Sequence, residues 1–293
     1  NKQAITLDLK QAASIEQVKQ LIGQYDILVE QFRPNVMARL GLSYEDLKAI
    51  NPRLIYCSIT GYGQTSDYKD RAGHDINYLA LAGIAGHSGR QDSGPPPLGI
   101  QVADVAGGSL HAVIGILAAV IERQVSGEGQ HIDISMTDCA FTLNSMVASA
   151  QVAGGEDQVA EGGMLNGVSF YDYYKTQDGR YLSIGSLEPQ FMLGLATALQ
   201  LPILAEKGAS MLTEDRQAVR AAIADAIVSQ SFAHWQQVFA ALDFCVEPVL
   251  SLAEAVQSDL AQQRGWLVDV PLVAGEASTQ KQLAHPIKFS RSQ

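Results

Sequence analysis

Two residues that can exchange a proton near neutral pH lie thirty positions apart, each in a glycine-containing segment. His74 stands in Gly73-His74-Asp75-Ile76-Asn77-Tyr78, and Asp104 is followed closely by Gly107-Gly108-Ser109. Both side-chain types catalyse proton transfer in enzymes, and glycine lets a ligand approach the backbone closely. These residue types in this pattern predict an acid–base catalytic site.

Each of the two residues also has a purely structural interpretation. An aspartate near a helix start can compensate the helix dipole and bind free amides, which stabilises by up to ~1 kcal/mol. For Asp104 alone the two interpretations are equally good, but the pairing with His74 and the glycines that follow favours catalysis. A lone histidine is more often a satisfied structural group. We expect that role for the other five: His87, His111, His131, His234 and His285.

The residues before the histidine alternate between helix and strand patterns. A capping-box sequence predicts a helix from Ser14 to Gly23, and a short apolar run at 27–29 predicts a buried strand. Ser43 is expected to cap a second helix, and 54–59 read as the next strand. This order is typical of a βαβ unit, which implies a parallel sheet with binding loops at the carboxyl ends of the strands. The loop at 61–64 lies at such an end and leads to the histidine.

Beyond the aspartate the patterns predict a helix, a strand and a second helix. Ser109 is expected to cap an apolar, buried helix that continues through Ile121. Alternation with period two over 130–136 predicts a half-buried strand. One long helix is expected to follow, from about Thr137 to Val152.

Glycine and acidic residues over 154–163 change the composition sharply and predict a domain boundary. Farther along, Asp178-Gly179 between two strand patterns is a strong β-hairpin signal. We therefore expect a large α/β domain at 1–160 and a smaller α+β domain at 161–275. Residues 276–293 are expected to return to the large domain.

The composition disfavours several classes of partner. A formal net charge of −11 over 293 residues is unfavourable for nucleic acid and for anionic membrane surfaces, so anionic ligands need local cations. No signal peptide is visible, and the longest apolar run, Leu110 to Ile121, is too short to span a bilayer. Cys57, Cys139 and Cys245 lack metal-site spacing, which predicts core thiols, no bound metal and a reducing compartment. We expect a cytoplasmic protein that binds neither nucleic acid nor membrane.

Three segments carry a family resemblance: Ala72 to Tyr78, Gly107-Gly108-Ser109, and Glu188-Pro189-Gln190-Phe191. They are similar to those of the alpha-methylacyl-CoA racemases, which belong to the class III CoA-transferase family, and the likeness runs from about Leu7 to Arg291. The resemblance implies a Rossmann-like parallel-sheet domain plus a smaller α+β domain in an interlocked homodimer. Family members carry an earlier βα segment and a further tail. We therefore expect a truncated chain in which the amino-terminal part of the large domain is missing.

The resemblance also implies a reaction, the racemisation of 2-methylacyl-CoA thioesters. One base must remove the α-proton and an acid on the opposite face must return it, and His74 with Asp104 can do so without a cofactor. The backbone amide of Asp75 is implied as the donor that stabilises the enolate oxygen. Glu188 is implied to hydrogen-bond the catalytic histidine, across the dimer, so that the sites are composite. The alternative interpretation of Glu188 is a surface carboxylate at the end of a hairpin, with no role in the site.

For the CoA part of an acyl-CoA substrate, the resemblance implies binding positions in four places along the sequence. Cations supply the positive charge that phosphates need in an acidic protein. Position 7 is leucine where relatives often have alanine, which puts the adenine contacts in doubt. The implied residues are Leu7, Asp8, Leu9, Lys10, Gln31, Phe32, Arg33, Arg39, Gly73, Asp75, Ile76, Asn77 and Tyr78.

Two other functions remain open at the level of sequence. In a class III CoA-transferase, Asp104 would be a nucleophile that forms an acyl anhydride and a thioester. His74 argues against this, because a transferase has no evident need for a histidine on the opposite face. The other alternative is a CoA-binding or scaffold protein without catalytic activity.

Overall fold

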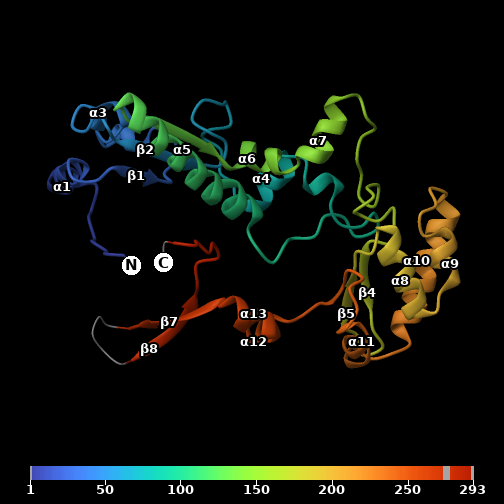
Figure 1. Cartoon of the computed structure of the whole chain (residues 1–293). Coiled ribbons are helices and arrows are strands. Elements are labelled where there is room, and N and C mark those ends of the chain that lie inside the picture. Colours follow the sequence, from blue (N-terminus) through green and yellow to red (C-terminus); the bar gives the residue numbers. More distant parts are fainter. Residues whose placement is uncertain (1, 273–277, 292–293) are drawn as a thin grey trace. The chain divides into compact units, whose positions relative to one another are not determined.

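The computed structural model describes residues 2–272 and 278–291 and divides the chain into two compact units, Asn1–Gly167 and Val168–Gln293 (Figure 1). The sequence places the domain boundary after residue 160, within the segment that joins the two units. Each unit has its own sheet and its own hydrophobic cores.

The first unit is built on a three-stranded parallel sheet, which confirms the predicted α/β class. Its strands are β1 (Ile27–Glu30), β2 (Ile55–Thr60) and β3 (His131–Ser135), in the order β1-β2-β3. The register pairs Ile27 with Ile55 and Tyr56 with His131. All three strands run in one direction, so their carboxyl ends lie along a single edge of the sheet.

Helices cover both faces of this sheet, because successive side chains of a strand point to opposite faces. Tyr56 faces a core formed with α1 (Ala12–Ile22), α2 (Val36–Arg39) and α3 (Tyr44–Lys48). The next residue, Cys57, faces the other side, where it packs with Ala112 and Ile134. Ala112 belongs to α5 (Leu110–Ser126), which packs against β2 and β3.

Two of the local predictions in this region are wrong. Helix α1 begins at Ala12 after Gln11, so Ser14 lies inside the helix and does not cap it. Strand β1 is not fully buried, since Ile27 is 39% and Val29 is 50% exposed. By contrast, the Ser43 cap is confirmed. Its hydroxyl accepts from the amide of Asp46, whose carboxylate accepts from the amide of Ser43.

The apolar helix starts six residues earlier than Ser109, which the sequence pattern predicts as its cap. Residues Ala103–Ser109 form a π-helix (η2) that runs without a break into α5. Gly107 and Gly108 let this segment pack against Met136 and Ile59, where an added Cβ would have little room. The π-helix places Asp104 inside a helix, within the first turns of a continuous helical segment.

Helix α5 is also less buried than expected. Val113, Ile114, Leu117 and Ile121 are each more than half exposed. The continuous helix Ala103–Ser126 has 24 residues and is long and apolar enough to cross a membrane, unlike the shorter run expected from the sequence. One such helix is weak evidence for a membrane span, because core helices of soluble proteins meet the same criterion.

The remaining helices of the first unit complete the frame of the site. Helix α4 (Asp75–Leu81) and the 3₁₀ helix η1 (Ala85–His87) follow the loop after β2. The single long helix expected after β3 is two helices, α6 (Met136–Leu143) and α7 (Ser145–Val152), separated at Asn144.

The second unit contains an antiparallel sheet of β4 (Asp172–Lys175), β5 (Tyr181–Ile184) and β6 (Val246–Pro248). The predicted hairpin at Asp178-Gly179 is confirmed by the pairing of β4 with β5. One core of sixteen buried residues, including Leu195, joins this sheet to its helices. These helices are α8 (Pro189–Leu199), α9 (Pro202–Lys207), α10 (Thr213–Val228) and α11 (Phe232–Phe239). Two further helices, α12 (Leu252–Gln257) and α13 (Asp259–Arg264), follow β6.

The chain then forms a two-stranded antiparallel ribbon of β7 (Leu267–Pro271) and β8 (Thr279–Leu283). The return of 276–293 to the large domain stays a prediction, and residues 276, 277, 292 and 293 lie outside the described part of the chain. All three cysteines are free. Cys57 is buried but Cys245 is exposed, so the expectation of three core thiols is wrong for Cys245.

Candidate active site

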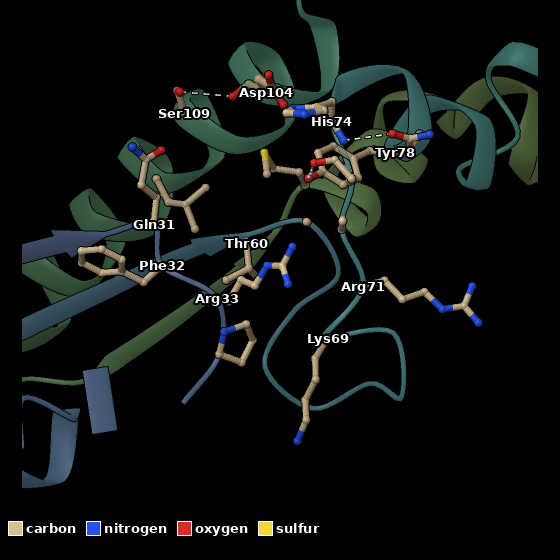
Figure 2. Close-up of a pocket in the computed structure, with 17 residues that line it drawn as sticks. Gln31, Phe32, Arg33, Thr60, Lys69, Arg71, His74, Tyr78, Asp104 and Ser109 are labelled. Carbon is tan, nitrogen blue, oxygen red and sulfur yellow. Dashed lines mark hydrogen bonds between the residues drawn. The ribbon is translucent and has the colours of Figure 1, made fainter. Parts of the chain in front are cut away.

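A cavity of about 640 Å³ opens at the carboxyl ends of the three parallel strands (Figure 2). Each strand contributes to it: Gln31 to Pro34 follow β1, Thr60 ends β2 and Gly61 follows it, and Met136 follows β3. This is where parallel sheets place their ligand sites. The remaining lining residues are Ile59, Lys69, Arg71, Ala72, Gly73, His74, Asn77, Tyr78, Asp104 and Ser109.

His74 lies on this cavity as the residue that precedes helix α4. Its side chain is exposed, and its backbone amide donates to Asn77 Oδ1 at 3.0 Å. Tyr78, one turn into the same helix, donates from its hydroxyl to the carbonyl of Gly73 at 2.6 Å. A Cβ at Gly73 or Gly61 would lie 2.6 Å from the Tyr78 ring, so both positions require glycine. The loop that carries His74 is thus fixed by α4 itself.

Asp104 enters the same cavity from the π-helix, and its side chain is half-buried. Its backbone amide donates to Asp75 Oδ1 at 3.1 Å, and its carbonyl accepts from the Ser109 hydroxyl at 3.1 Å. Desolvation raises the pKa of the Asp104 carboxyl, the nearby Asp75 carboxylate raises it further, and His74 lowers it. In Figure 2 the His74 ring and the Asp104 carboxylate lie at the same end of the cavity. The arrangement therefore brings two proton-exchanging groups together.

The cavity carries a local excess of positive charge in an acidic chain. Arg33, Lys69 and Arg71 line it, whereas Asp104 is the one Asp or Glu among the lining residues. Arg71 stacks on Tyr68, with its guanidinium carbon 3.8 Å from the ring centre. Cations of this kind can hold an anionic ligand such as a phosphate.

The structure brings eight of the residues predicted from the sequence to this cavity: Gln31, Phe32, Arg33, Gly73, His74, Asn77, Tyr78 and Asp104. Asp75 is buried beside it and 7% exposed, and Ile76 is exposed but does not line it. Leu7 to Lys10 form a turn in which Asp8 Oδ1 accepts from the Lys10 amide, away from the cavity lining. Arg39 ends α2 and does not line the cavity either.

Glu188 belongs to the second unit, where it precedes helix α8. Its side chain is exposed, and its carboxylate accepts no hydrogen bond from any residue that the structure describes. Its role beside the catalytic histidine stays a prediction.

Several lining residues are not predicted from the sequence, most notably Lys69 and Arg71. A signal was present, because two cations in the five residues before His74 are conspicuous in an acidic chain. Thr60, Ser109 and Met136 gave no such signal, since only the folded sheet and the π-helix bring them to the cavity.

The other five histidines lie outside the cavity lining, and each has a structural partner. His131 Nε2 is 2.9 Å from Ser58 Oγ, and the His234 ring lies edge-on to Trp235. The partners of the remaining three are Asn144 Oδ1 for His87, the Ala106 carbonyl for His111 and the Ile287 carbonyl for His285.

Comparisons with known proteins identify the family. The chain matches the model of CoA-transferase family III over residues 1–293. It is 37% identical to the alpha-methylacyl-CoA racemase of Mus musculus, over 91% of this chain and 70% of that protein. It is also 32% identical to the acetyl-CoA:oxalate CoA-transferase of Acetobacter aceti, over 91% and 69%. The crystal structure of a CAIB/BAIF family protein from Brucella suis superposes with a TM-score of 0.81 and 30% identity, covering 98% of this chain and 75% of that one.

Proposed function

The chain belongs to CoA-transferase family III, and from that premise we propose that it racemises 2-methylacyl-CoA thioesters by a cofactor-independent 1,1-proton transfer. One observation carries the proposal: His74 and Asp104, on separate elements, line a single cavity. The 37% identity to a mouse racemase over most of the chain supports the same choice.

The reaction needs two groups that act in turn. One base removes the proton from the carbon next to the thioester, the bond electrons move into an enolate, and the second group returns a proton to the opposite face. His74 is proposed to take the proton of the (S) thioester and Asp104 that of the (R) thioester. The upward shift of the Asp104 pKa, caused by desolvation and by Asp75, suits this role because it makes the carboxylate a stronger base.

The enolate oxygen requires a hydrogen-bond donor that is already in position. The amide of Asp75 is among the first amides of α4, which have no acceptor within their own helix. It donates to no other described residue, so it is available to a ligand. Loss of one such donor typically costs ~10²-fold to 10³-fold in rate.

The CoA phosphates are proposed to bind to local cations. Arg33, Lys69 and Arg71 supply them at the cavity. Lys10 and Arg39 remain proposed contacts on the resemblance alone. The Arg33 guanidinium makes no hydrogen bond or ion pair with any residue in the described part of the chain, so it is free for a ligand.

The active form is proposed to be a homodimer in which Glu188 of one copy orients His74 of the other. The exposed, unpaired Glu188 carboxylate supports this. Inactive His74→Ala and Glu188→Ala chains can be co-expressed with different affinity tags and the hybrid dimer isolated. Composite sites restore one functional site per hybrid, whereas a hybrid as inactive as its parents contradicts the proposal.

The alternative is a CoA-transferase, which relatives such as the Acetobacter aceti protein support. The Asp104 carboxylate would attack the thioester carbonyl, release CoA as the thiolate and form an acyl anhydride. His74 lines the same cavity as Asp104, and it has no evident use in that scheme. The observations therefore favour racemisation.

One experiment separates the three functions. The protein is incubated in heavy water with (R)- or (S)-2-methylacyl-CoA, with and without an acceptor acid. Racemisation predicts deuterium at the α-carbon and formation of the other enantiomer without acceptor. A transferase instead moves CoA only when acceptor is present, and a CoA-binding protein does neither.

A further inference from the structure

The side chain of Asp75 joins the two elements that carry the proposed bases. Its Oδ1 accepts from the amide of Ala103 at 2.6 Å and from that of Asp104 at 3.1 Å. Asp75 as a whole is 7% exposed, so solvent competes little for these bonds. Asp75 directly follows His74 in sequence, yet the two amides it binds lie 28 and 29 residues farther on.

These bonds supply a helix cap from a distant element. The first amides of a helix have no acceptor within it and usually bind the side chain of the residue just before it. Here Val102, which precedes the π-helix, makes no such bond with its side chain, and Asp75 takes that place. The early start of the helix, and with it the position of Asp104, therefore depends on Asp75.

The same turn of α4 also fixes the other base. Asn77 Oδ1 accepts from the His74 amide at 3.0 Å, two residues after Asp75. The first turn of α4 thus holds His74 through Asn77 and Asp104 through Asp75. No other hydrogen bond among the described residues connects α4 with the π-helix.

An aspartate at this position has an electrostatic cost that a neutral cap would avoid. An asparagine caps a helix about as well as an aspartate does. The Asp75 carboxylate, however, lies close enough to Asp104 to disfavour its ionised form. The other groups that act on Asp104 are His74 and the Tyr78 hydroxyl from α4, while Met136 and Ile59 pack as apolar neighbours against the π-helix glycines.

We infer that Asp75 is a positioning residue whose carboxylate fixes the start of the π-helix on α4 and so sets the spacing of Asp104 from His74. This inference rests on the proposed two-base function. It assigns the Asp75 side chain a task distinct from that of its backbone amide, which every substitution at this position retains.

The test uses the whole chain with Asp75→Ala and Asp75→Asn, and Asp46→Asn as matched control. Asp46 also accepts from the amide at a helix start, on α3, and does not line the cavity. Deuterium incorporation is measured separately from the (R) and the (S) thioester. A misplacement of about 1 Å can cost ~10²-fold, so Asp75→Ala should slow exchange from the (R) thioester, which Asp104 deprotonates, at least tenfold more than exchange from the (S) thioester.

Asp75→Asn separates position from charge. It keeps an oxygen acceptor for both amides, so exchange from the (R) thioester should fall less than in Asp75→Ala. The negative charge is lost, so the pKa of Asp104 should fall, and the pH at which exchange from the (R) thioester reaches half its maximum should fall with it. ¹³C-aspartate NMR measures that pKa directly, with the Asp104 signal assigned from Asp104→Asn.

Several outcomes overturn the inference. Asp75→Ala could slow both exchange rates equally, as a general loss of folded protein would, or it could slow neither. The pKa of Asp104 could also be the same in Asp75→Asn as in wild type. If wild-type protein exchanges no α-proton from either thioester, the proposed function fails instead. The NMR titration still decides whether Asp75 acts on Asp104, since it needs no turnover.

Discussion

Two carboxylates in the two units of this chain have opposite surroundings. Asp104 in the first unit faces the Asp75 carboxylate in a partly desolvated cavity, which raises its pKa. Glu254 in the second unit forms a bidentate pair with Arg180, with both N–O distances at 2.7 Å, and accepts from the Ser251 amide. These partners lower the pKa of Glu254 to about 2.

The difference separates a structural carboxylate from one suited to proton transfer. Every strong interaction of Glu254 favours its ionised form, so the group is locked in one protonation state near neutral pH. For Asp104, desolvation and the Asp75 carboxylate both disfavour the ionised form and only His74 favours it, so its surroundings do not hold it in the ionised form as those of Glu254 do. The same contrast holds for cations, since the Arg180 guanidinium is paired with Glu254, whereas the Arg33 guanidinium has no hydrogen-bond or ion-pair partner among the residues the structure describes.

The most direct test of the difference between Asp104 and Glu254 is to neutralise each carboxylate in turn. Asp104→Asn should lower racemisation by ~10²-fold to 10⁴-fold, the usual contribution of a positioned acid or base. Its melting temperature should stay the same or rise, because a like-charge contact with Asp75 is removed. Glu254→Gln should keep the wild-type rate and lose stability at neutral pH. Rates are measured by conversion of (S)- to (R)-thioester, and stability by thermal unfolding.

If Asp104→Asn racemises at the wild-type rate, Asp104 is not one of the two bases. Covalent capture of an acyl or CoA group on Asp104 in the presence of an acceptor acid, found by mass spectrometry, would instead support the transferase.

A second prediction concerns the loop that carries His74. An added Cβ at Gly73 would lie 2.5 Å from the Tyr62 hydroxyl oxygen and 2.6 Å from the Tyr78 ring, so Gly73→Ala must displace these rings or His74. We expect kcat to fall by about tenfold to a hundredfold, because small displacements of a base are costly. Gly86→Ala is the matched control, since an added Cβ there meets no atom within 4 Å. Equal rates for the two variants would show that the loop tolerates the strain.

The sequence was sufficient for features that depend on local chemistry. Alternating strand and helix patterns predicted the parallel sheet, Asp178-Gly179 predicted the hairpin, and the pattern at Ser43 predicted the helix cap. Because ligand loops follow the ends of parallel strands, the position of His74 after such a strand predicted that it lies at a ligand site, whereas its catalytic role came from the family resemblance and stays a prediction.

The predictions that were wrong concern features that depend on distant parts of the chain. Ser109 resembles a helix cap, but the helix begins earlier because Asp75 caps it from 28 residues away. Burial, together with the Asp75 carboxylate that this contact brings close, raises the pKa of Asp104, and no local pattern could predict either cause. Likewise, a run of apolar residues in the sequence did not reveal that one face of α5 is exposed, since burial depends on what packs against the helix.

A third prediction compares the free and the paired arginine. Arg33→Ala should raise KM for acyl-CoA by about tenfold and change kcat less, since a lost charged hydrogen bond costs ~1.5–3 kcal/mol. Arg180→Ala should leave KM unchanged and lower thermal stability, because its partner is Glu254. Steady-state kinetics over a range of acyl-CoA concentrations measures both. An unchanged KM in Arg33→Ala would remove Arg33 from the CoA site.

The smallest expected effect concerns acid unfolding of the second unit. A carboxyl has a pKa of about 4.3 in an unfolded chain, whereas that of Glu254 is about 2 in the folded one. A lowered folded pKa contributes stability that is present above the unfolded pKa and is lost as pH falls through the folded pKa. The contribution of Glu254 should therefore disappear between about pH 4 and pH 2. It should be modest, since the Arg180 and Glu254 side chains are 34% and 42% exposed and solvent screens the pair.

Glu254→Gln isolates this contribution. The variant should be less stable than wild type at pH 7, and its free energy of unfolding should fall less steeply between pH 4 and pH 2, so that the two proteins converge. Urea unfolding followed by the fluorescence of Trp235, which lies in the core of the second unit, reports on that region. Asp104→Asn is the counterpart, because a raised pKa acts in the opposite direction: ionised Asp104 destabilises the fold, so that variant should gain relative to wild type as pH rises. If both variants follow the wild-type pH dependence, the two carboxylates do not differ in the way their surroundings indicate.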